Sequence, residues 1–368
     1  MPRTVKVKRR LSKRFILLLL VLLATALILW EVFSNRGDFA RDAVIFSEVM
    51  HILSENGDFI DIYASDSGFF VTDANGGVSF YDINGERAFR HGHGIAGAVL
   101  FGSGYGAVVF AHGGRVLNYY NTYGLVYSVL IESAISHLAK SPCGFVALAA
   151  RSDGGGYDIV AIDQNGQIRN LAHFVNDANA VAICPQAATI AAAFSEITDE
   201  GINSTIALIS VATGEIFAKS LYNPEQTISQ LSFMDGNRLL AISDTRIFAM
   251  NAANASEIWE EPLNMRISAS AVTNAHLVIT HAPSNVIVYD STGGEILDMQ
   301  KYTALTSIYL NFEHIILGTR GRFYGYNLRG ENLWELQLPS GTDLRFMGNR
   351  NALVAKTPTS LRIFNGSN

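Results

Sequence analysis

VIVYDSTGGEIL, residues 286–297, consists of two apolar runs joined by a polar turn that contains Gly293 and Gly294. Val, Ile and Tyr favour extended strands, and a pair of glycines accepts the positive φ angles of a tight hairpin turn. The stretch therefore predicts a β-hairpin made of two short strands.

The same pattern recurs along most of the chain. It reads VSFYDINGERAF from Val78, TIALISVATGEIFAKS from Thr205 and RFYGYNLRGENLWEL from Arg322. The turn positions are separated by 39, 42, 48, 40, 39, 37 and 36 residues, and they are Gly85, Gly124, Gly166, Gly214, Asn254, Gly293, Gly330 and Gly366. Self-similarity at a period of this length is typical of propeller blades.

Two further apolar runs precede each hairpin, so that each repeat holds four strands. In the unit that starts at Ile228 they read QLSFM and RLLAIS, with Asp235 and Gly236 in the turn between them. The hairpin then supplies the outer two strands of a four-stranded antiparallel blade. We therefore expect an all-β protein in which residues 42–368 form an eight-bladed β-propeller.

The eighth blade lacks one strand at the C-terminal end. Seven complete units run from about Asp58 to Leu338, whereas the last unit, from Gly341, supplies only RFM, ALVAK and LRIF. A blade without its outer strand would leave a sheet edge unpaired. The segment DAVIFSEVM, residues 42–50, precedes the first unit and has no hairpin partner of its own. We expect this N-terminal strand to complete the last blade and close the ring.

The first 33 residues predict a membrane anchor. Residues 1–14 contain seven Lys or Arg and no acidic residue, and residues 15–33 are apolar except for Thr25 and Glu31. Nineteen helical residues span about 28 Å, close to the hydrocarbon thickness of a bilayer. We expect a basic cytoplasmic tail (1–14), a transmembrane signal-anchor helix (15–33) and a short linker (34–41).

A cleaved signal peptide is the alternative interpretation of this segment. Its apolar region would be shorter and would end in small residues. Here Trp30 and Phe33 occupy the far end instead, which favours an uncleaved anchor.

The distribution of charge predicts the orientation and the partners. Seven of the 27 Lys and Arg precede the apolar segment, so the rest of the chain carries 20 basic against 33 acidic residues. Positive charge is retained on the cytoplasmic side, which places the propeller outside the cell membrane. An acidic ectodomain argues against nucleic acid as a partner. The expected partners are the lipid bilayer, through residues 15–33, and an envelope protein or the cell wall.

The repeats resemble those of quinoprotein-type and WD40-like propellers, through GENLW around Trp334 and SEIW around Trp259. The layout of basic tail, membrane span and propeller also resembles an uncharacterised family of bacterial membrane-anchored propellers with a domain of unknown function. The resemblance implies the fold and no particular activity. Quinoprotein enzymes would add a Trp floor and acidic calcium ligands, but the chain has three Trp, of which one is Trp30. We therefore expect no cofactor.

Loops that connect blades, and loops between the second and third strands of a blade, share one face of a propeller and commonly carry function. On that face we expect His91, His93 and His112 to lie near one another. They are weak candidates for a zinc or copper site, against the simpler interpretation of solvated loop histidines. The expected interaction face consists of charged residues in these loops, namely Arg115, Arg151, Asp153, His173, Glu196, Asp199, Glu200, Arg320 and Arg322.

Two further features remain open in the sequence. The longest of these loops, expected at 195–205, reads SEITDEGINST and is more simply a solvated acidic tip than a calcium loop. Cys143 and Cys184 fall in turns between the inner strands of neighbouring units. Two separate buried thiols are the preferred interpretation, and a disulfide in an exported protein is the alternative.

No catalytic motif is present with the structural context that it requires, so the expected function is non-enzymatic. The favoured interpretation is a membrane-tethered propeller that serves as a protein-interaction or scaffold module of the cell envelope. One alternative is an extracytoplasmic glycan-active enzyme with a pair of carboxylates at the channel mouth. The other is an ectodomain that senses a metal or a small ligand.

Overall fold

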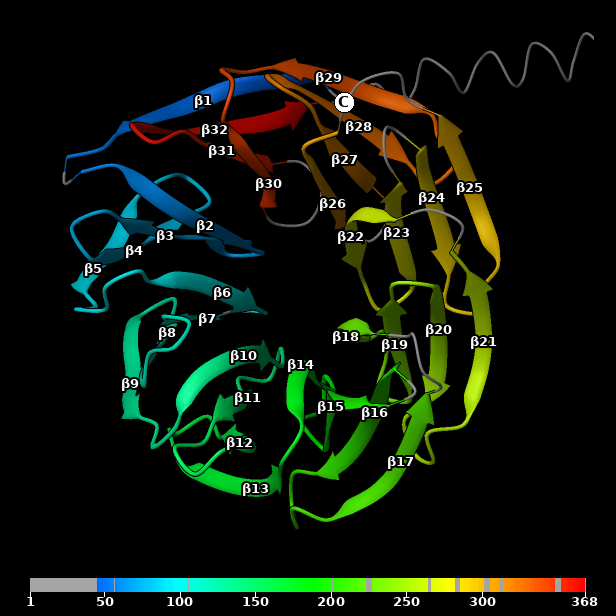
Figure 1. Ribbon diagram of the computed structural model, residues 1–368. Coiled ribbons are helices and arrows are strands. Elements are labelled where there is room, and N and C mark those ends of the chain that lie inside the picture. Colours follow the sequence, from blue (N-terminus) through cyan, green and yellow to red (C-terminus); the bar gives the residue numbers. More distant parts are fainter. Residues whose placement is uncertain are drawn as a thin grey trace, which may run out of the picture. The chain divides into compact units, whose positions relative to one another are not determined.

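The computed structural model describes residues 45–55, 57–104, 106–199, 201–222, 227–263, 266–281, 285–300, 305–311, 314–347 and 352–367. The chain divides into two compact units, of which the second comprises Phe46–Ser367 and contains the propeller. Its described residues form eight four-stranded antiparallel sheets. Figure 1 shows these sheets arranged as blades around a centre. The expected all-β, eight-bladed architecture is confirmed.

The first four blades follow one another along the chain. Blade 1 holds β2 (Phe59–Ser65), β3 (Gly68–Asp73), β4 (Gly77–Asp82) and β5 (Arg87–Gly92). Blade 2 holds β6 (Val99–Ser103), β7 (Gly106–Phe110), β8 (Val116–Asn121) and β9 (Gly124–Leu130). Blade 3 holds β10 (Ala134–Lys140), β11 (Val146–Arg151), β12 (Tyr157–Ile162) and β13 (Ile168–Phe174). Blade 4 holds β14 (Asp177–Ile183), β15 (Thr189–Thr198), β16 (Gly201–Ser210) and β17 (Ile216–Tyr222).

The remaining blades continue in the same order. Blade 5 holds β18 (Ile228–Phe233), β19 (Arg238–Ser243), β20 (Arg246–Asn251) and β21 (Glu257–Pro262). Blade 6 holds β22 (Ile267–Val272), β23 (His276–His281), β24 (Asn285–Asp290) and β25 (Glu295–Gln300). Blade 7 holds β26 (Ser307–Asn311), β27 (His314–Gly318), β28 (Arg322–Asn327) and β29 (Asn332–Gln337).

Blade 8 combines the two ends of the propeller, as expected. It holds β30 (Asp343–Met347), β31 (Ala352–Lys356) and β32 (Ser360–Ser367), and its fourth strand is β1 (Ile45–Leu53). The strand order is β1-β32-β31-β30, so the N-terminal strand covers the edge of the C-terminal one (Figure 1). The expected strand began at residue 42, and residues 42–44 lie outside the described part.

The turn glycine of most repeats is required by the contact between blades. Gly166 has a φ of +82°, and a Cβ added there would lie 2.9 Å from Cγ of Tyr127, on the outer strand of the preceding blade. A side chain at this position would therefore clash as well as strain the backbone. In blade 5, Ala255 takes the positive-φ position of the turn, with a φ of +56°.

The hydrophobic core lies between blades. The second and third strands of a blade are covered on both faces, and all five residues of β7 are buried. One core cluster joins Phe110 and Leu117 of blade 2 to Leu148 and Val160 of blade 3. Packing on two faces explains why these strands read as nearly continuous apolar runs.

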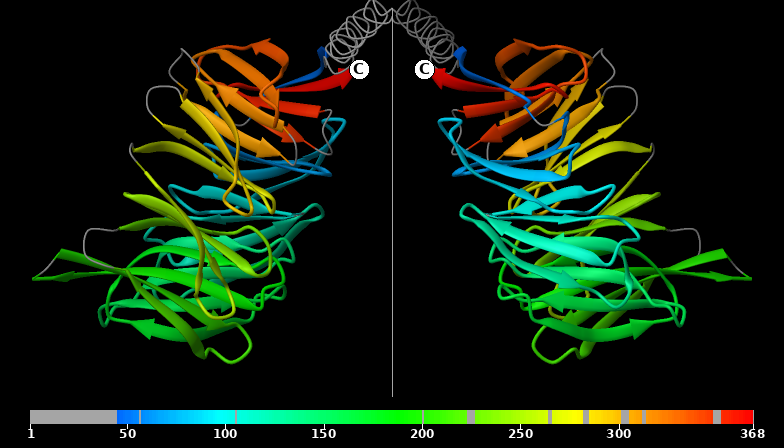
Figure 2. Two further views of the ribbon diagram at one scale, coloured as in Figure 1. Left: turned by 90° about the vertical axis from the view of Figure 1, so that its right-hand side faces the viewer. Right: turned by 90° about the vertical axis from the view of Figure 1, so that its left-hand side faces the viewer.

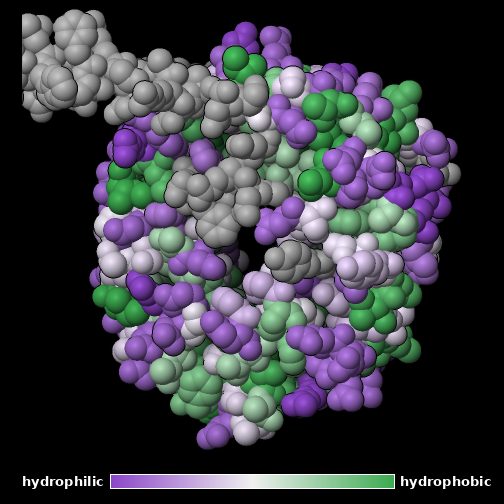
Figure 3. Space-filling model, turned by 180° about the vertical axis from the view of Figure 1, so that it is seen from behind, coloured by the Kyte–Doolittle hydropathy of each residue, from purple (hydrophilic) through white to green (hydrophobic). Residues whose placement is uncertain are grey.

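The strand order gives the propeller two different faces. On the loop face lie the connections between blades and those between the second and third strands of each blade. On the turn face lie the other two connections of each blade, and Figure 3 shows this face with mixed polar and apolar residues around a central hollow. Because β1 leads to β2 across the loop face, β1 begins on the turn face.

The described residues contain no helix that is long and apolar enough to span a bilayer. The expected tail (1–14), span (15–33) and linker (34–41) all lie outside the described part of the chain.

Candidate functional site

Two of the predicted interaction residues form an ion pair between blades 2 and 3. Arg115 follows the loop after β7, and Asp153 lies in the loop after β11. The Arg115 Nη2 atom is 2.7 Å from Asp153 Oδ1, and the two side chains are 45% and 75% exposed. A pair this exposed contributes little stability, but it links two loops of the same face.

His173 also finds an acidic partner on the loop face. Its Nδ1 atom lies 2.7 Å from Oδ1 of Asp158, and the hydroxyl of Ser133 donates to the other oxygen at 2.9 Å. Partial burial alone would raise the pKa of Asp158, but these hydrogen bonds and the nearby histidine lower it below its usual value. Sequence reasoning placed His173 in a loop between blades, whereas it lies within β13.

The other predicted arginines do not join this group. Arg151 ends β11 and is exposed. Arg320 and Arg322 belong to blade 7, where Arg322 Nη1 lies 3.5 Å from Oε1 of Glu335 on the adjacent strand. The predicted interaction residues are therefore divided between distant parts of the ring.

The expected loop at 195–205 is wrong, because the structure forms a long hairpin there. β15 and β16 have ten residues each, and their pairing continues to Thr198 opposite Gly201. Figure 2 shows the hairpin extending beyond the loops of the other blades. Ile197 and Ile202 are the only apolar side chains in SEITDEGINST, so the segment lacks the alternation that would predict two strands.

Three exposed aliphatic side chains belong to this hairpin and to the connection that precedes β14. Ile197 lies directly opposite Ile202, so both point to the same side of the sheet. Val175 lies in the connection between β13 and β14, two residues before Asp177, which is opposite Ser195. Val175, Ile197 and Ile202 are 82%, 85% and 40% exposed. We call these three residues the aliphatic row.

Acidic side chains lie close to the aliphatic row. Asp177 of β14 is exposed and Asp199 follows β15, while Glu196 is exposed on the side of the hairpin opposite to Ile197. Asn176 Nδ2 donates to Oε2 of Glu196 at 3.5 Å, which ties the connection between blades to the hairpin. Glu200, a predicted member of the interaction face, lies outside the described residues.

The three candidate metal histidines have separate partners. His91 belongs to β5, and its Nδ1 atom lies 3.2 Å from the hydroxyl of Tyr120. His112 donates through Nδ1 to the carbonyl of Ser136 at 3.0 Å. His93 is buried, and burial lowers its pKa. Within the described ranges, no three His, Cys, Asp or Glu side chains are grouped so as to hold a metal ion.

Two carboxylates lie where inner strands of blades 8 and 1 meet, as the enzymatic alternative would require. Asp343 accepts a hydrogen bond from the hydroxyl of Tyr309 at 2.8 Å, and Arg345 Nη1 is 3.0 Å from its Oδ1. Asp61 accepts the backbone N–H of Ile62 at 2.8 Å. Both carboxylates are thus bound to donors of the protein itself.

The electrostatics of this group are unusual. Burial, helped by the charge of Asp61 and opposed by that of Lys356, raises the pKa of Asp343 to about 6. Burial likewise lowers the pKa of Arg345 to about 10, against the opposing effect of Asp61. Sequence reasoning missed this group, because its members come from three different blades.

The two cysteines are separate, as preferred, but only one is buried. Cys143 and Cys184 are both free thiols, Cys143 exposed and Cys184 buried. The expectation that both would be buried is therefore wrong for Cys143. It lies in the connection between β10 and β11, on the turn face, where a turn residue meets solvent.

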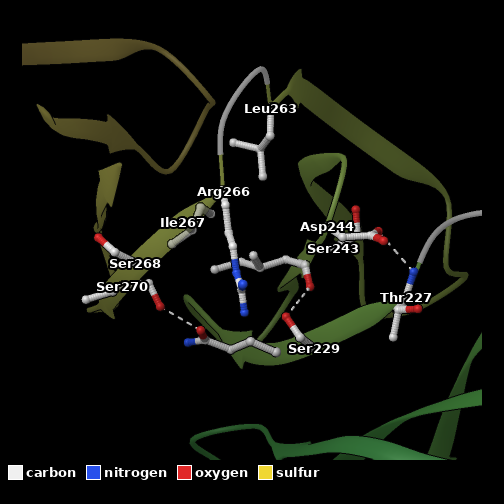
Figure 4. Close-up of a pocket in the computed structure, with 12 residues that line it drawn as sticks. Thr227, Ser229, Ser243, Asp244, Leu263, Arg266, Ile267, Ser268 and Ser270 are labelled. Atoms are coloured by element: carbon white, nitrogen blue, oxygen red, sulfur yellow. Dashed lines mark hydrogen bonds between the residues drawn. The ribbon is translucent and has the colours of Figure 1, made fainter. Parts of the chain in front are cut away.

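A pocket of about 750 Å³ opens between blades 5 and 6. The described residues that line it belong to β18, the end of β19, β22 and the connections beside them. The polar ones include Thr227, Ser229, Gln230, Asp244, Arg266 and Ser268. Figure 4 shows the Arg266 side chain directed into the pocket. Sequence reasoning gave no sign of this pocket.

Comparisons with known proteins agree with the fold. The profile of a family described as "Family of unknown function (DUF5711)" matches residues 51–361. Similar solved structures include BamB from Moraxella catarrhalis, with 15% identity, coverage of 87% of this chain and 100% of that chain, and a TM-score of 0.59. Sqt1 from Saccharomyces cerevisiae has 11% identity, coverage of 87% and 98%, and a TM-score of 0.62. The C-terminal WD40 domain of Sif2 has 12% identity, the same two coverages and a TM-score of 0.63. No curated protein matches the sequence.

Proposed function

We propose that this chain, which belongs to the family of unknown function (DUF5711), is a membrane-tethered protein-interaction module of the cell envelope. In this proposal residues 15–33 span the membrane and the propeller lies outside the cell. The loop face binds a partner protein. The observation that carries the proposal is the aliphatic row at the end of the β15–β16 hairpin.

The geometry of the row favours a protein partner. Val175, Ile197 and Ile202 present apolar surface on an element that extends beyond the rest of the loop face (Figure 2). Covering a Val or Ile side chain fully contributes roughly 1.5–3 kcal/mol, which is comparable to the effect of about 2 kcal/mol that defines an interface hot spot. Because Asp177, Glu196 and Asp199 lie close to the row, the partner is expected to surround its apolar patch with Lys or Arg.

The position of β1 supports the tethering part of the proposal. β1 begins on the turn face, so the preceding chain joins the propeller there. A tether attached to the turn face leaves the loop face free for a partner. A linker of only eight residues, 34–41, would hold the turn face close to the membrane.

The interaction is tested by site-specific photocrosslinking of the full-length chain in its native cells. A benzoylphenylalanine at Ile197 is expected to yield one discrete adduct, and Ile202→Asp should abolish it. The matched control is the same group at Ile83, which is 48% exposed in a turn on the opposite face. Adducts with lipid alone, or equal adducts from both positions, would contradict a protein-binding row.

The orientation is tested with the native cysteines. A maleimide that cannot cross membranes should label Cys143, which is exposed, in intact cells, and leave Cys184, which is buried, unlabelled. Cys143→Ser should remove the signal. Labelling that appears only after the cells are permeabilised would place the propeller in the cytoplasm.

A further inference from the structure

The pocket between blades 5 and 6 contains a basic side chain without a partner. Arg266 is exposed and lies in the connection that leads into β22. Among the residues that the structure describes, it has no hydrogen-bond or ion-pair partner. Arg115 and Arg246, which also lie at blade edges, are by contrast paired with carboxylates. Arg266 is therefore available to a ligand.

The other polar groups of the pocket are partly held in place. Ser270 donates to Oε1 of Gln230 at 2.6 Å, which connects β22 to β18. Ser229 donates to the carbonyl of Ile242 at 3.3 Å. The backbone N–H of Thr227 donates to Oδ1 of Asp244 at 3.1 Å. Figure 4 shows these bonds around the Arg266 side chain, so the walls are ordered while the cation is free.

The charge balance of the pocket selects the class of anion. Arg266 supplies one positive charge, and Asp244 supplies one negative charge on another wall. A planar guanidinium binds a carboxylate through two parallel hydrogen bonds. A phosphate group, with its larger negative charge, would be repelled more strongly by Asp244 and by the acidic propeller. A monoanionic carboxylate therefore fits better.

The remaining lining favours a peptide. Ile242, Leu263 and Ile267 form an apolar part of the wall, where an aliphatic side chain next to the carboxylate could pack. The volume of about 750 Å³ is larger than a single carboxylate needs and falls within the usual range for ligand pockets. The pocket opens on the loop face, because two of its segments are connections between blades.

From these observations we infer that the pocket between β18 and β22 binds a carboxylate of a peptide segment, with Arg266 as the recognising group. The carboxylate belongs to a Glu or Asp side chain or to a C-terminus. This inference rests on the proposed function, since it supplies a second contact for a partner protein on the loop face.

Three tetrapeptides test the inference by saturation-transfer NMR with the full-length chain in detergent. Ac-Ala-Glu-Ala-Ile-NH₂ has only a side-chain carboxylate, and Ac-Ala-Gln-Ala-Ile-OH has only a C-terminal one. Ac-Ala-Gln-Ala-Ile-NH₂ has neither. We expect one of the charged peptides to bind at least about tenfold more tightly than the neutral one, the effect of a charge-assisted hydrogen-bond pair.

Variants identify the side chain responsible. Arg266→Gln should remove the preference for the charged peptide, and Arg266→Lys should keep part of it. The matched control is Arg329→Gln, an exposed arginine in a turn on the opposite face, which should change nothing. An unchanged preference in Arg266→Gln, equal binding of all three peptides, or stronger competition by inorganic phosphate than by acetate would each overturn the inference.

The test is separate from that of the aliphatic row. Ile202→Asp should abolish the adduct that forms from position 197 and leave peptide binding unchanged. Loss of the adduct with retained peptide binding supports both sites. Failure of peptide binding with an intact adduct refutes only the carboxylate site.

Discussion

Replacing Asp343 by Asn should change the way in which the stability of the propeller depends on pH. The Asp343 side chain is 22% exposed, and burial is the main reason that its pKa rises from 3.8 to about 6. Asn keeps an oxygen that can accept the hydrogen bond from Tyr309 and cannot ionise. The variant therefore resembles the protonated acid at every pH.

The sign and size of the effect follow from proton linkage. The folded protein holds the proton of Asp343 more tightly than the unfolded chain does. The stabilisation of the folded state by this protonated carboxyl group is therefore complete below pH 3.8 and is lost as pH rises through about 6. A shift of this size corresponds to about 3 kcal/mol, of which about 2 kcal/mol falls between pH 4 and pH 8. The variant should gain that much relative to the wild type over this interval.

Urea denaturation of both proteins at pH 4 and pH 8 measures the difference. Titration of groups remote from residue 343 is common to the two proteins and cancels. Asp290→Asn is the control without a large pH effect in this interval, because hydrogen bonds, chiefly from Thr292, lower the pKa of Asp290. The stabilisation by its charge is lost mainly below pH 3.8, so Asp290→Asn should shift stability almost equally at pH 4 and pH 8. If Asp343→Asn shifts stability equally at the two pH values, the carboxylate is solvated and our account of its environment is wrong.

Two further predictions concern the ring itself. Gly166→Ala should lower the free energy of unfolding by about 1–3 kcal/mol, because residue 166 has a positive φ and the new methyl group would clash with Tyr127. Ala255→Gly should change the free energy of unfolding by less than about 1 kcal/mol, since the relief of backbone strain offsets the loss of the buried methyl group. Equal effects of the two substitutions in chemical denaturation would refute the role of the Gly166–Tyr127 contact. Removal of residues 1–44 should leave Tm unchanged. Removal of residues 1–53 also deletes β1, so it should lower Tm and cause self-association through the exposed edge of β32. Equal Tm values for the two truncated proteins would contradict closure of the ring by β1.

The fold could be predicted because its signals are local and repeated. Each hairpin carries its own strand formers and its own turn, and the turn glycine is required by a contact that recurs between blades, as at Gly166 and Gly293. Closure of the ring could be predicted by counting strands. Blade 8 lacked its outer strand, one N-terminal segment had no partner of its own, and β1 from that segment occupies the outer position.

The candidate sites were harder to predict because they depend on contacts between blades. The pocket combines residues of β18 and of the end of β19 with Leu263 and residues 266–270, and only the packing of blades 5 and 6 brings these segments together. Asp343 meets Asp61 across the closure of the ring, from opposite ends of the chain. The end of the β15–β16 hairpin, at residues 195–205, was mistaken for a loop because its polar residues outnumber Ile197 and Ile202.

Both proposed binding sites lie on the loop face of the propeller, whereas the chain enters the propeller on the turn face. The aliphatic row lies on blade 4, and the pocket with Arg266 lies between blades 5 and 6. Both therefore occupy neighbouring blades of the loop face, while β1 begins on the turn face. Exposed isoleucines at the end of a strand promote aggregation unless a partner covers them. A single partner that contacted the row and the pocket together would gain affinity from both, because binding at one site raises the effective concentration at the other.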